Sequence, residues 1–240
     1  MRVAIKRISK SATTRWGWLG GKVVPLELAL LCQVNEVRCS GVVDIVEWHE
    51  TTEAFLLVMV RPHPAVDLYD YVSKHKRVKE SLARHIIRQL ITALQHCINH
   101  GVLHRDIKLE NILLNPETME ITLIDFGCGD YVRSAPYKEF AGTPEYYAPE
   151  WFIHKQYYGE ALTVWSIGVL FYSLICGSLP FRSAKDITEK EITKFSNDIS
   201  RNARDLITCL LLKNPRDRLK LGAVLFHLFF QQERNSRDAA

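Results

Sequence analysis

Several features that would assign this chain to a special class of protein are missing from its sequence. No stretch approaches the eighteen or more uninterrupted apolar residues of a transmembrane helix, so we predict no membrane span. None of the six cysteines forms a Cys-x-x-Cys pair, which argues against a disulfide framework or a zinc finger. The formal net charge is only +4, too small to indicate a nucleic-acid partner. The P-loop pattern G-x-x-x-x-G-K-S/T is also absent, which weighs against a P-loop nucleotide hydrolase.

The composition that remains is that of an ordinary globular protein. Hydrophobic residues make up 47% and charged residues 24%, which argues against a disordered chain, a collagen and a coiled coil. A length of 240 residues fits one large domain or one domain in two lobes. Residues 1–24 contain six basic side chains and no acidic one. A mitochondrial transit peptide is one explanation of such a start, and a basic strand with its linker is the other.

The first part of the chain is predicted to form strands and one helix. Residues 3–8 read as a strand, and residues 25–34 read as a helix with proline in its first turn. Two further apolar runs, 42–48 and 55–60, are separated by polar residues and predict a hairpin. The two prolines that follow, Pro62 and Pro64, predict a stiff link between two lobes.

The rest of the chain is predicted to be mostly helical. Apolar residues recur at helical spacing over 82–98, and a continuous apolar run predicts a buried central helix at 164–175. Two more amphipathic helices are expected at 203–212 and 222–230. Short strands are expected at residues 112–114 and 121–124, between the first two large helices.

Four motifs carry the chemistry, and together they resemble those of protein kinases. The stretch 104–111 reads H-R-D-I-K-L-E-N, followed by D-F-G at 125–127 and A-P-E at 148–150. Upstream, residues 3–6 read V-A-I-K. The order and the spacing of all four make chance an implausible explanation. Phosphoryl transfer mainly requires positioning and neutralisation of charge, and these residue types supply both.

The resemblance implies a role for each residue of these motifs. Asp106 is expected to accept the proton of a substrate hydroxyl, while Asn111 and Asp125 are expected to hold Mg²⁺. Lys6 is expected to bind the α- and β-phosphates of ATP, oriented by an ion pair with Glu27.

Other residues are expected to support the catalytic loop. Lys108 stands where serine/threonine kinases place the lysine that reaches the transferred phosphoryl group, and Thr143 resembles the threonine that bonds the base and this lysine. Glu150 is expected to form a buried structural ion pair with Arg218, far from the chemistry. Cys128 is either a reactive thiol near the nucleotide or an inert small apolar residue. Arg105 is expected to meet an activation-loop phosphate or to pack locally.

Over nearly its whole length the chain resembles the Pim family of serine/threonine kinases. The segments that carry the resemblance are 16–17, 24–27, 61–64, 67–71, 97–106 and 149–151. Pro64 stands where most kinases present a backbone N–H to adenine, so the resemblance implies one hinge hydrogen bond, accepted by Val60, with Met59 as gatekeeper. The expected nucleotide-binding residues are Ala4, Lys6, Glu27, Met59, Val60, Arg61, Leu113 and Asp125.

The same resemblance implies protein substrates with basic residues before the phosphorylated serine or threonine. Asp67, Asp70 and Glu110 are expected to meet an arginine three residues before the acceptor. Leu109 replaces an acid of the family, and residues 182–186 are mostly reversed in charge, so a basic residue five before the acceptor should be tolerated less well. The resemblance also implies activity without activation-loop phosphorylation and a role in survival and cell-cycle signalling.

One departure from the family concerns the start of the sequence. Only five residues precede Lys6, so the G-x-G-x-x-G loop that covers the phosphates is missing from it. The sequence is either a truncated record of a longer active kinase or a true short form. The chemical residues are intact, which favours the first explanation. A catalytically weak or silent kinase-like binding module is the alternative function.

We therefore predict an α+β, bilobal protein-kinase-like fold. It has an incomplete β-rich small lobe (1–60), a hinge (61–64) and a mainly helical large lobe (65–240). The predicted activity is transfer of the γ-phosphoryl group of ATP, with Mg²⁺, to serine or threonine. In this fold the basic start belongs to a strand and its linker. We expect a monomer in the cytoplasm, with the nucleus as a second compartment, and no nucleic-acid or membrane partner.

Overall fold

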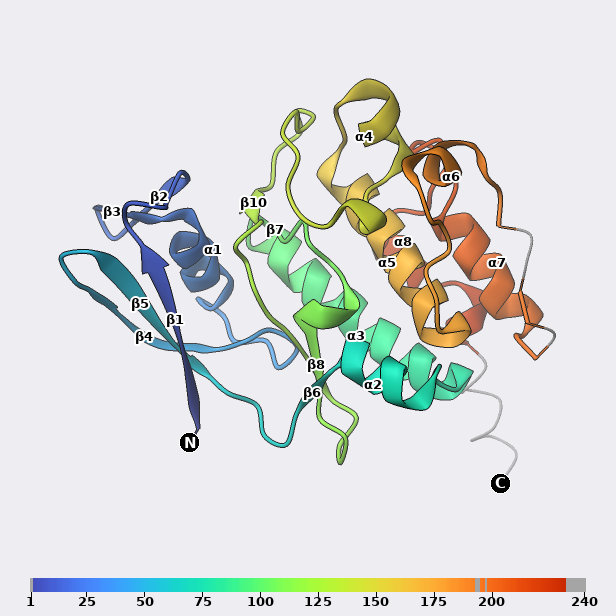
Figure 1. The fold of residues 1–240 in the computed structure, drawn as a ribbon, viewed down its shortest axis with the longest axis horizontal. Helices are drawn as coiled ribbons and strands as arrows, with labels where there is room; N and C mark the ends of the chain where they lie inside the picture. Colours follow the sequence, from blue (N-terminus) through green and yellow to red (C-terminus); the bar gives the residue numbers. More distant parts are fainter. Residues whose placement is uncertain (1, 193–194, 197, 232–240) are drawn as a thin grey trace.

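A three-stranded antiparallel sheet forms the first part of the molecule. The computed structural model describes residues 2–192, 195–196 and 198–231. Strands β1 (Val3–Ser9), β5 (Ala54–Val60) and β4 (Ile45–Glu50) lie in the order β1-β5-β4. Helix α1 (Leu26–Val34) lies beside this sheet, at the blue end of Figure 1. The basic start of the sequence therefore includes strand β1, as expected.

A second hairpin, which the sequence analysis did not predict, precedes α1. It consists of β2 (Trp16–Leu19) and β3 (Lys22–Pro25), and Gly20 and Gly21 between them both have positive φ. Positive φ is readily adopted by glycine, so the two glycines allow the tight turn. The hairpin packs on α1 through Gly17, where an added Cβ would lie 3.0 Å from the Cβ of Ala29.

The predicted strand at 42–48 begins later than expected. Val42 pairs with Leu123, and the N–H of Val43 donates to the carbonyl of Leu123 at 3.0 Å. Strand β9 (Ile121–Leu123) therefore takes the backbone of Val42 and Val43, and β4 starts only at Ile45.

The chain passes from the sheet to the helical part through residues 61–65. It then forms β6 (Val66–Asp67), α2 (Leu68–His75) and α3 (Glu80–Asn99). The peptide bond between His63 and Pro64 is cis. Asp67 caps α2, because its carboxylate accepts the N–H of Asp70 at 2.8 Å.

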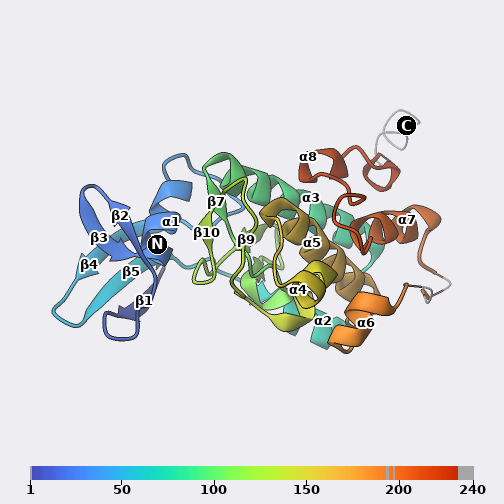
Figure 2. The same cartoon turned by 90° about the horizontal axis from the view of Figure 1, so that it is seen from above.

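Helix α5 (Gly159–Cys176) forms the centre of the helical part. It is long and apolar enough to cross a membrane by composition, but 72% of that stretch is buried inside the fold, as for a core helix. Helices α3 and α5 lie side by side in both Figure 1 and Figure 2. Around them lie α4 (Pro149–His154), α6 (Ala184–Glu189), α7 (Arg201–Leu210) and α8 (Leu221–Val224).

The prediction of a single helix at 222–230 is wrong. Helix α8 ends at Val224, and a separate 3₁₀ turn, η3 (Leu228–Phe230), follows. His227 caps this turn by accepting the N–H of Phe229. Two arginines of α3 then bind the carbonyls of the turn: Arg84 that of Phe229 at 2.6 Å and Arg88 that of Phe230 at 2.9 Å. In a continuous helix the N–H of Phe229 would instead donate to the carbonyl of Leu225, so the cap at His227 marks the break between α8 and η3.

Two small sheets position the chemical motifs. Strand β7 (Val102–Leu103) pairs with β10 (Asp130–Tyr131), and β8 (Ile112–Leu114) pairs with β6 and β9. The H-R-D stretch follows β7, and the D-F-G stretch lies between β9 and β10. Because β7 and β10 are paired, both stretches lie at the same place in the fold.

Candidate active site

Lys6 lies between two carboxylates that come from distant parts of the sequence. Its Nζ lies 2.5 Å from Oε1 of Glu27 on α1 and 2.8 Å from Oδ1 of Asp125 in the D-F-G stretch. Burial alone would lower the pKa of Lys6, but the charge of Glu27 and the hydrogen bonds outweigh it and raise that pKa. Burial tends to raise the pKa of Asp125, and Lys6 reverses this and lowers it. Lys6 and Asp125 are therefore both held in their charged forms.

Asp106 is held by side chains from both sides. The hydroxyl of Thr143 donates to Oδ1 of Asp106 at 2.7 Å and accepts from Nζ of Lys108 at 2.9 Å. The same Nζ lies 3.2 Å from Oδ2 of Asp106. Asn111 donates to that Oδ2 at 3.0 Å and to the carbonyl of Asp106 at 2.9 Å. The carboxylate is thus fixed in orientation, as a general base requires.

His104 is a buried support of the loop that carries Asp106. It is almost fully buried, and its ring contacts Phe126 edge-on at 4.8 Å between centroids. Its Nδ1 accepts the N–H of Asp106 at 3.3 Å, so Nε2 carries the proton and donates to the carbonyl of Ile124 at 3.0 Å. Burial lowers the pKa of His104, consistent with a neutral ring. This histidine connects the H-R-D loop to Ile124, the residue directly before the D-F-G stretch.

Arg105 packs locally, one of the two readings of this residue. Its backbone has φ of +66°, and its guanidinium donates to the carbonyl of Cys128 at 2.8 Å and pairs with Asp130 at 3.2 Å. The structure gives no support to a reactive Cys128, because burial and the nearby acids raise the pKa of its thiol.

The expected nucleotide-binding residues line one cavity of about 280 Å³. All eight of them are in its wall: Ala4, Lys6, Glu27, Met59, Val60, Arg61, Leu113 and Asp125. The sequence analysis missed five other residues of this wall: Leu31, Val43, Pro62, Ile124 and Phe126. Leu31 lies one helical turn after Glu27, so helical spacing alone would have found it.

Asp125 in the wall of this cavity and Asn111 in the catalytic loop have side chains that fit a magnesium ion. Magnesium prefers oxygen ligands, and Asp125 supplies a carboxylate. Asn111 commits its side-chain nitrogen to Asp106, which leaves the amide oxygen as the ligand atom. The donor set therefore agrees with the metal role expected of Asn111 and Asp125.

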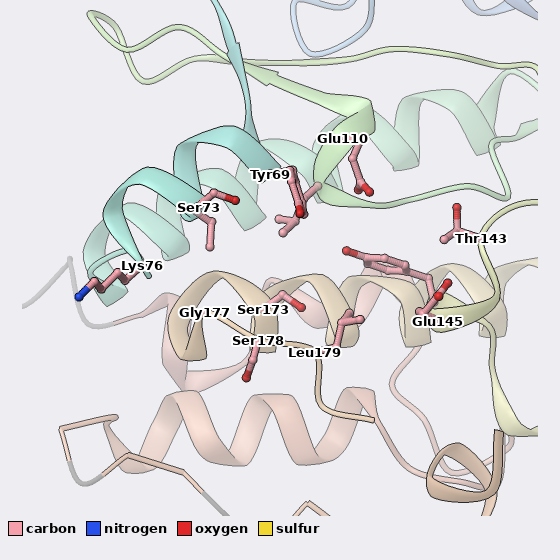
Figure 3. A pocket seen from close by; sticks show the side chains of 13 residues that line it. Tyr69, Ser73, Lys76, Glu110, Thr143, Glu145, Ser173, Gly177, Ser178 and Leu179 are labelled. Carbon is pink, nitrogen blue, oxygen red and sulfur yellow. The ribbon is translucent and has the colours of Figure 1, made fainter. Parts of the chain in front are cut away.

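A separate groove of about 590 Å³ begins at Thr143 and runs between α2 and the end of α5. Glu110 and Glu145 lie at its Thr143 end, and Lys76 lies at the opposite end (Figure 3). Glu110 is in the place expected of a substrate-binding acid, and Glu145 was not predicted. Asp67 and Asp70 are not in the wall of this groove.

Glu150 and Arg218 form a two-pronged ion pair away from both cavities. The distances are 2.8 Å from Nη1 to Oε1 and 2.6 Å from Nη2 to Oε2. Both side chains are buried, as expected from the A-P-E motif.

These elements define a class of protein. A β-rich part, a helical part, and a cavity with paired lysine and carboxylates are the features of a protein kinase. The sequence matches the protein kinase domain family over residues 1–230, and the chain belongs to this family. Its mixture of helices and sheets is the α+β kinase fold.

The curated relatives are serine/threonine kinases. The chain is 38% identical to serine/threonine-protein kinase prk-2 of Caenorhabditis elegans over 240 residues, covering 99% of this chain and 54% of prk-2. It is also 38% identical to serine/threonine-protein kinase pim-2 of Danio rerio over 234 residues, covering 94% of this chain and 75% of pim-2. Mouse serine/threonine-protein kinase SIK1 is 31% identical over 238 residues, covering 97% of this chain and 30% of SIK1. The chain is thus a protein kinase domain of the serine/threonine class, and it spans about half the length of prk-2.

Proposed function

We propose that this chain transfers the γ-phosphoryl group of ATP to serine or threonine hydroxyls of proteins. The observation that carries the proposal is a cavity whose apolar wall leads to Lys6, Glu27 and Asp125. Its apolar end suits a base, and its charged end suits phosphates.

The residues then divide the work of the reaction. Asp106 accepts the proton of the substrate hydroxyl, whose oxygen forms the new bond to phosphorus while the bond to ADP breaks. Lys108 lies within 3.2 Å of Asp106 and offers positive charge to the transferred group. Thr143 holds both side chains in place. A magnesium ion held by Asn111 and Asp125 would neutralise phosphate charge.

For substrates, we propose one arginine near the acceptor and a weaker demand further away. The two carboxylates of the groove, Glu110 and Glu145, both lie near Thr143 (Figure 3). The wall further from Thr143 carries Ser173 and Ser178, and it ends at Lys76. An arginine facing Glu110 gains a charge-assisted hydrogen bond, whereas one facing Lys76 meets a like charge.

The test is phosphate transfer from labelled ATP to serine peptides. The wild-type chain is compared with Asp125→Ala, and peptides carry arginine or alanine at three and at five residues before the serine. We expect transfer that disappears in the variant and depends on the nearer arginine. No transfer by the wild type would contradict the proposed activity, and equal dependence on both arginines would contradict the proposed preference.

We make three further proposals. The Pim resemblance supports a role in survival and cell-cycle signalling, and the sequence alone leads us to expect a monomeric state and a location in the cytoplasm or nucleus. Sedimentation of the purified chain tests the second, since a dimer at micromolar concentration would contradict it.

A further inference from the structure

Asp130, on strand β10, forms ion pairs with two arginines from different parts of the chain. Arg105 of the catalytic loop lies 3.2 Å from its Oδ2, and Arg15 of the linker between β1 and β2 lies 3.3 Å from the same atom. The side chain of Arg105 is 1% exposed and that of Asp130 is 17% exposed. Two guanidinium groups this close repel each other, so the carboxylate of Asp130 is what allows them to share the site.

Arg15 also holds the start of helix α1. Its carbonyl accepts the N–H of Leu26 at 2.9 Å, and Leu26 is the first residue of α1. The first N–H groups of a helix have no partner within the helix, and the N-cap residue Pro25 offers no side-chain hydrogen bond. Arg15 therefore contacts strand β10 with its side chain and helix α1 with its backbone.

These contacts close a circuit around the active site. Arg105 precedes the proposed base Asp106, and Leu26 precedes Glu27, which pairs with Lys6. Lys6 in turn pairs with Asp125, five residues before Asp130. Each neighbour in this circuit is joined by the chain itself or by a contact of 3.3 Å or less.

The packing around the circuit leaves little room for independent movement. A Cβ added at Gly17 would lie 3.2 Å from the hydroxyl of Tyr131, and one at Gly129 would lie 2.8 Å from a methyl carbon of Leu30 on α1. Strand β2 and helix α1 are thus in close contact with β10 and the residue before it, so a shift of one is transmitted to the others.

We propose that Arg15 and Asp130 are positioning residues that align Glu27 and Lys6 with the catalytic loop. This inference rests on the proposed kinase activity. The carboxylate of Asp130 supplies the negative charge that holds Arg105 and Arg15 together. Neither residue touches the reacting atoms, so each acts through Arg105, Leu26 and their neighbours.

The test is a double-mutant cycle in kinetics. The variants are Arg15→Gln, Asp130→Asn, the double variant, and Arg15→Lys as the conservative rescue. The matched control is Arg7→Gln, because Arg7 also pairs with an acid, Glu53, but at 3.7 Å between two exposed side chains. For each variant, kcat and the KM values for ATP and for peptide are measured on protein shown to be folded.

We expect each single variant to lower kcat about 3- to 20-fold, with the KM for peptide unchanged. The double variant should lose no more kcat than the more impaired of the two single variants, because both substitutions remove the same link. Arg15→Lys should recover part of kcat, and Arg7→Gln should leave it unchanged. Losses that multiply in the double variant, or an equal loss in Arg7→Gln, would overturn the proposal.

A second measurement separates this inference from the proposed activity. Amide hydrogen exchange in α1 needs no catalysis and should increase in Asp130→Asn and Arg15→Gln. If the wild type is inactive but exchange in α1 still increases, the activity is refuted and the positioning role stands. If the wild type is active and neither kcat nor exchange responds, the positioning role is refuted.

Discussion

Loss of the ion pair between Glu150 and Arg218 should lower the free energy of unfolding by an amount that can be calculated from its contacts. Replacing Arg218 with methionine removes two hydrogen bonds to Glu150 and three to backbone carbonyls, those of Leu212, Ala161 and Lys213. It leaves a carboxylate whose side chain is only 6% exposed without its arginine. Breaking a buried pair in this way costs about 3–5 kcal/mol.

That cost predicts a large shift in thermal unfolding. For a domain of this size, each kcal/mol lowers Tm by about 2–4 °C, so Arg218→Met should lower Tm by about 6–20 °C. The measurement is thermal unfolding followed by circular dichroism. Arg216→Met is the matched control, because Arg216 is exposed and lies two residues away. We expect the control to change stability by no more than about 0.5 kcal/mol.

A double variant separates the loss of the pair from the burial of a lone charge. Replacing both residues, Glu150→Leu with Arg218→Met, removes the unpaired carboxylate and should cost less than Arg218→Met alone. A Tm drop below about 2 °C in Arg218→Met would refute the reasoning, because a penalty of about 3 kcal/mol or more cannot be that small. A double variant less stable than the single one would refute it too.

Three further predictions concern the active site and pH dependence. Thr143→Ser should keep kcat within about twofold, whereas Thr143→Val should lower it about 10- to 100-fold, because only a hydroxyl can bond both Lys108 and Asp106. Mg²⁺ with ATP should stabilise the wild type by about 2.7 kcal/mol at a hundredfold excess over Kd and so raise its Tm. This increase in Tm should disappear in Asp125→Ala. Burial lowers the pKa of Lys213 to about 8, below its value in the unfolded chain. The unfolded state then binds more protons from about pH 8 to 10.5, so stability should rise over that range and the rise should be absent in Lys213→Met. Denaturant titrations at each pH would contradict this if both proteins changed alike.

The sequence predicted most of the helices and strands because their signals are local. Residues 164–175 are continuously apolar, and they lie in the buried helix α5. The hairpin of β2 and β3 was missed because its strands are only four residues each and carry little alternation. The prediction of one helix at 222–230 failed because the side chain of His227 accepts the N–H of Phe229, and apolar spacing does not reveal such a bond.

For the candidate site, the sequence predicted the residues of the spaced motifs but not the contacts between residues that are distant in sequence. The stretches around Asp106 and Asp125 match patterns whose spacing is set by the chemistry. Glu145 escaped prediction because its place in the groove depends on how residues 144–146 turn next to Glu110. Arg15 escaped it because its partner Asp130 is 115 residues away and belongs to no motif.

The pairing of β1 with β5 fixes the length of the nucleotide cavity. Val60, at one end of the cavity, belongs to the same strand as Leu57, which pairs with Lys6 at the other end. Three residues of strand span about 10 Å, so the register sets the distance between the places proposed for base and phosphates. A slip of one residue would turn Lys6 to the opposite face of the sheet. The register of two strands therefore determines how long a molecule the cavity can accept.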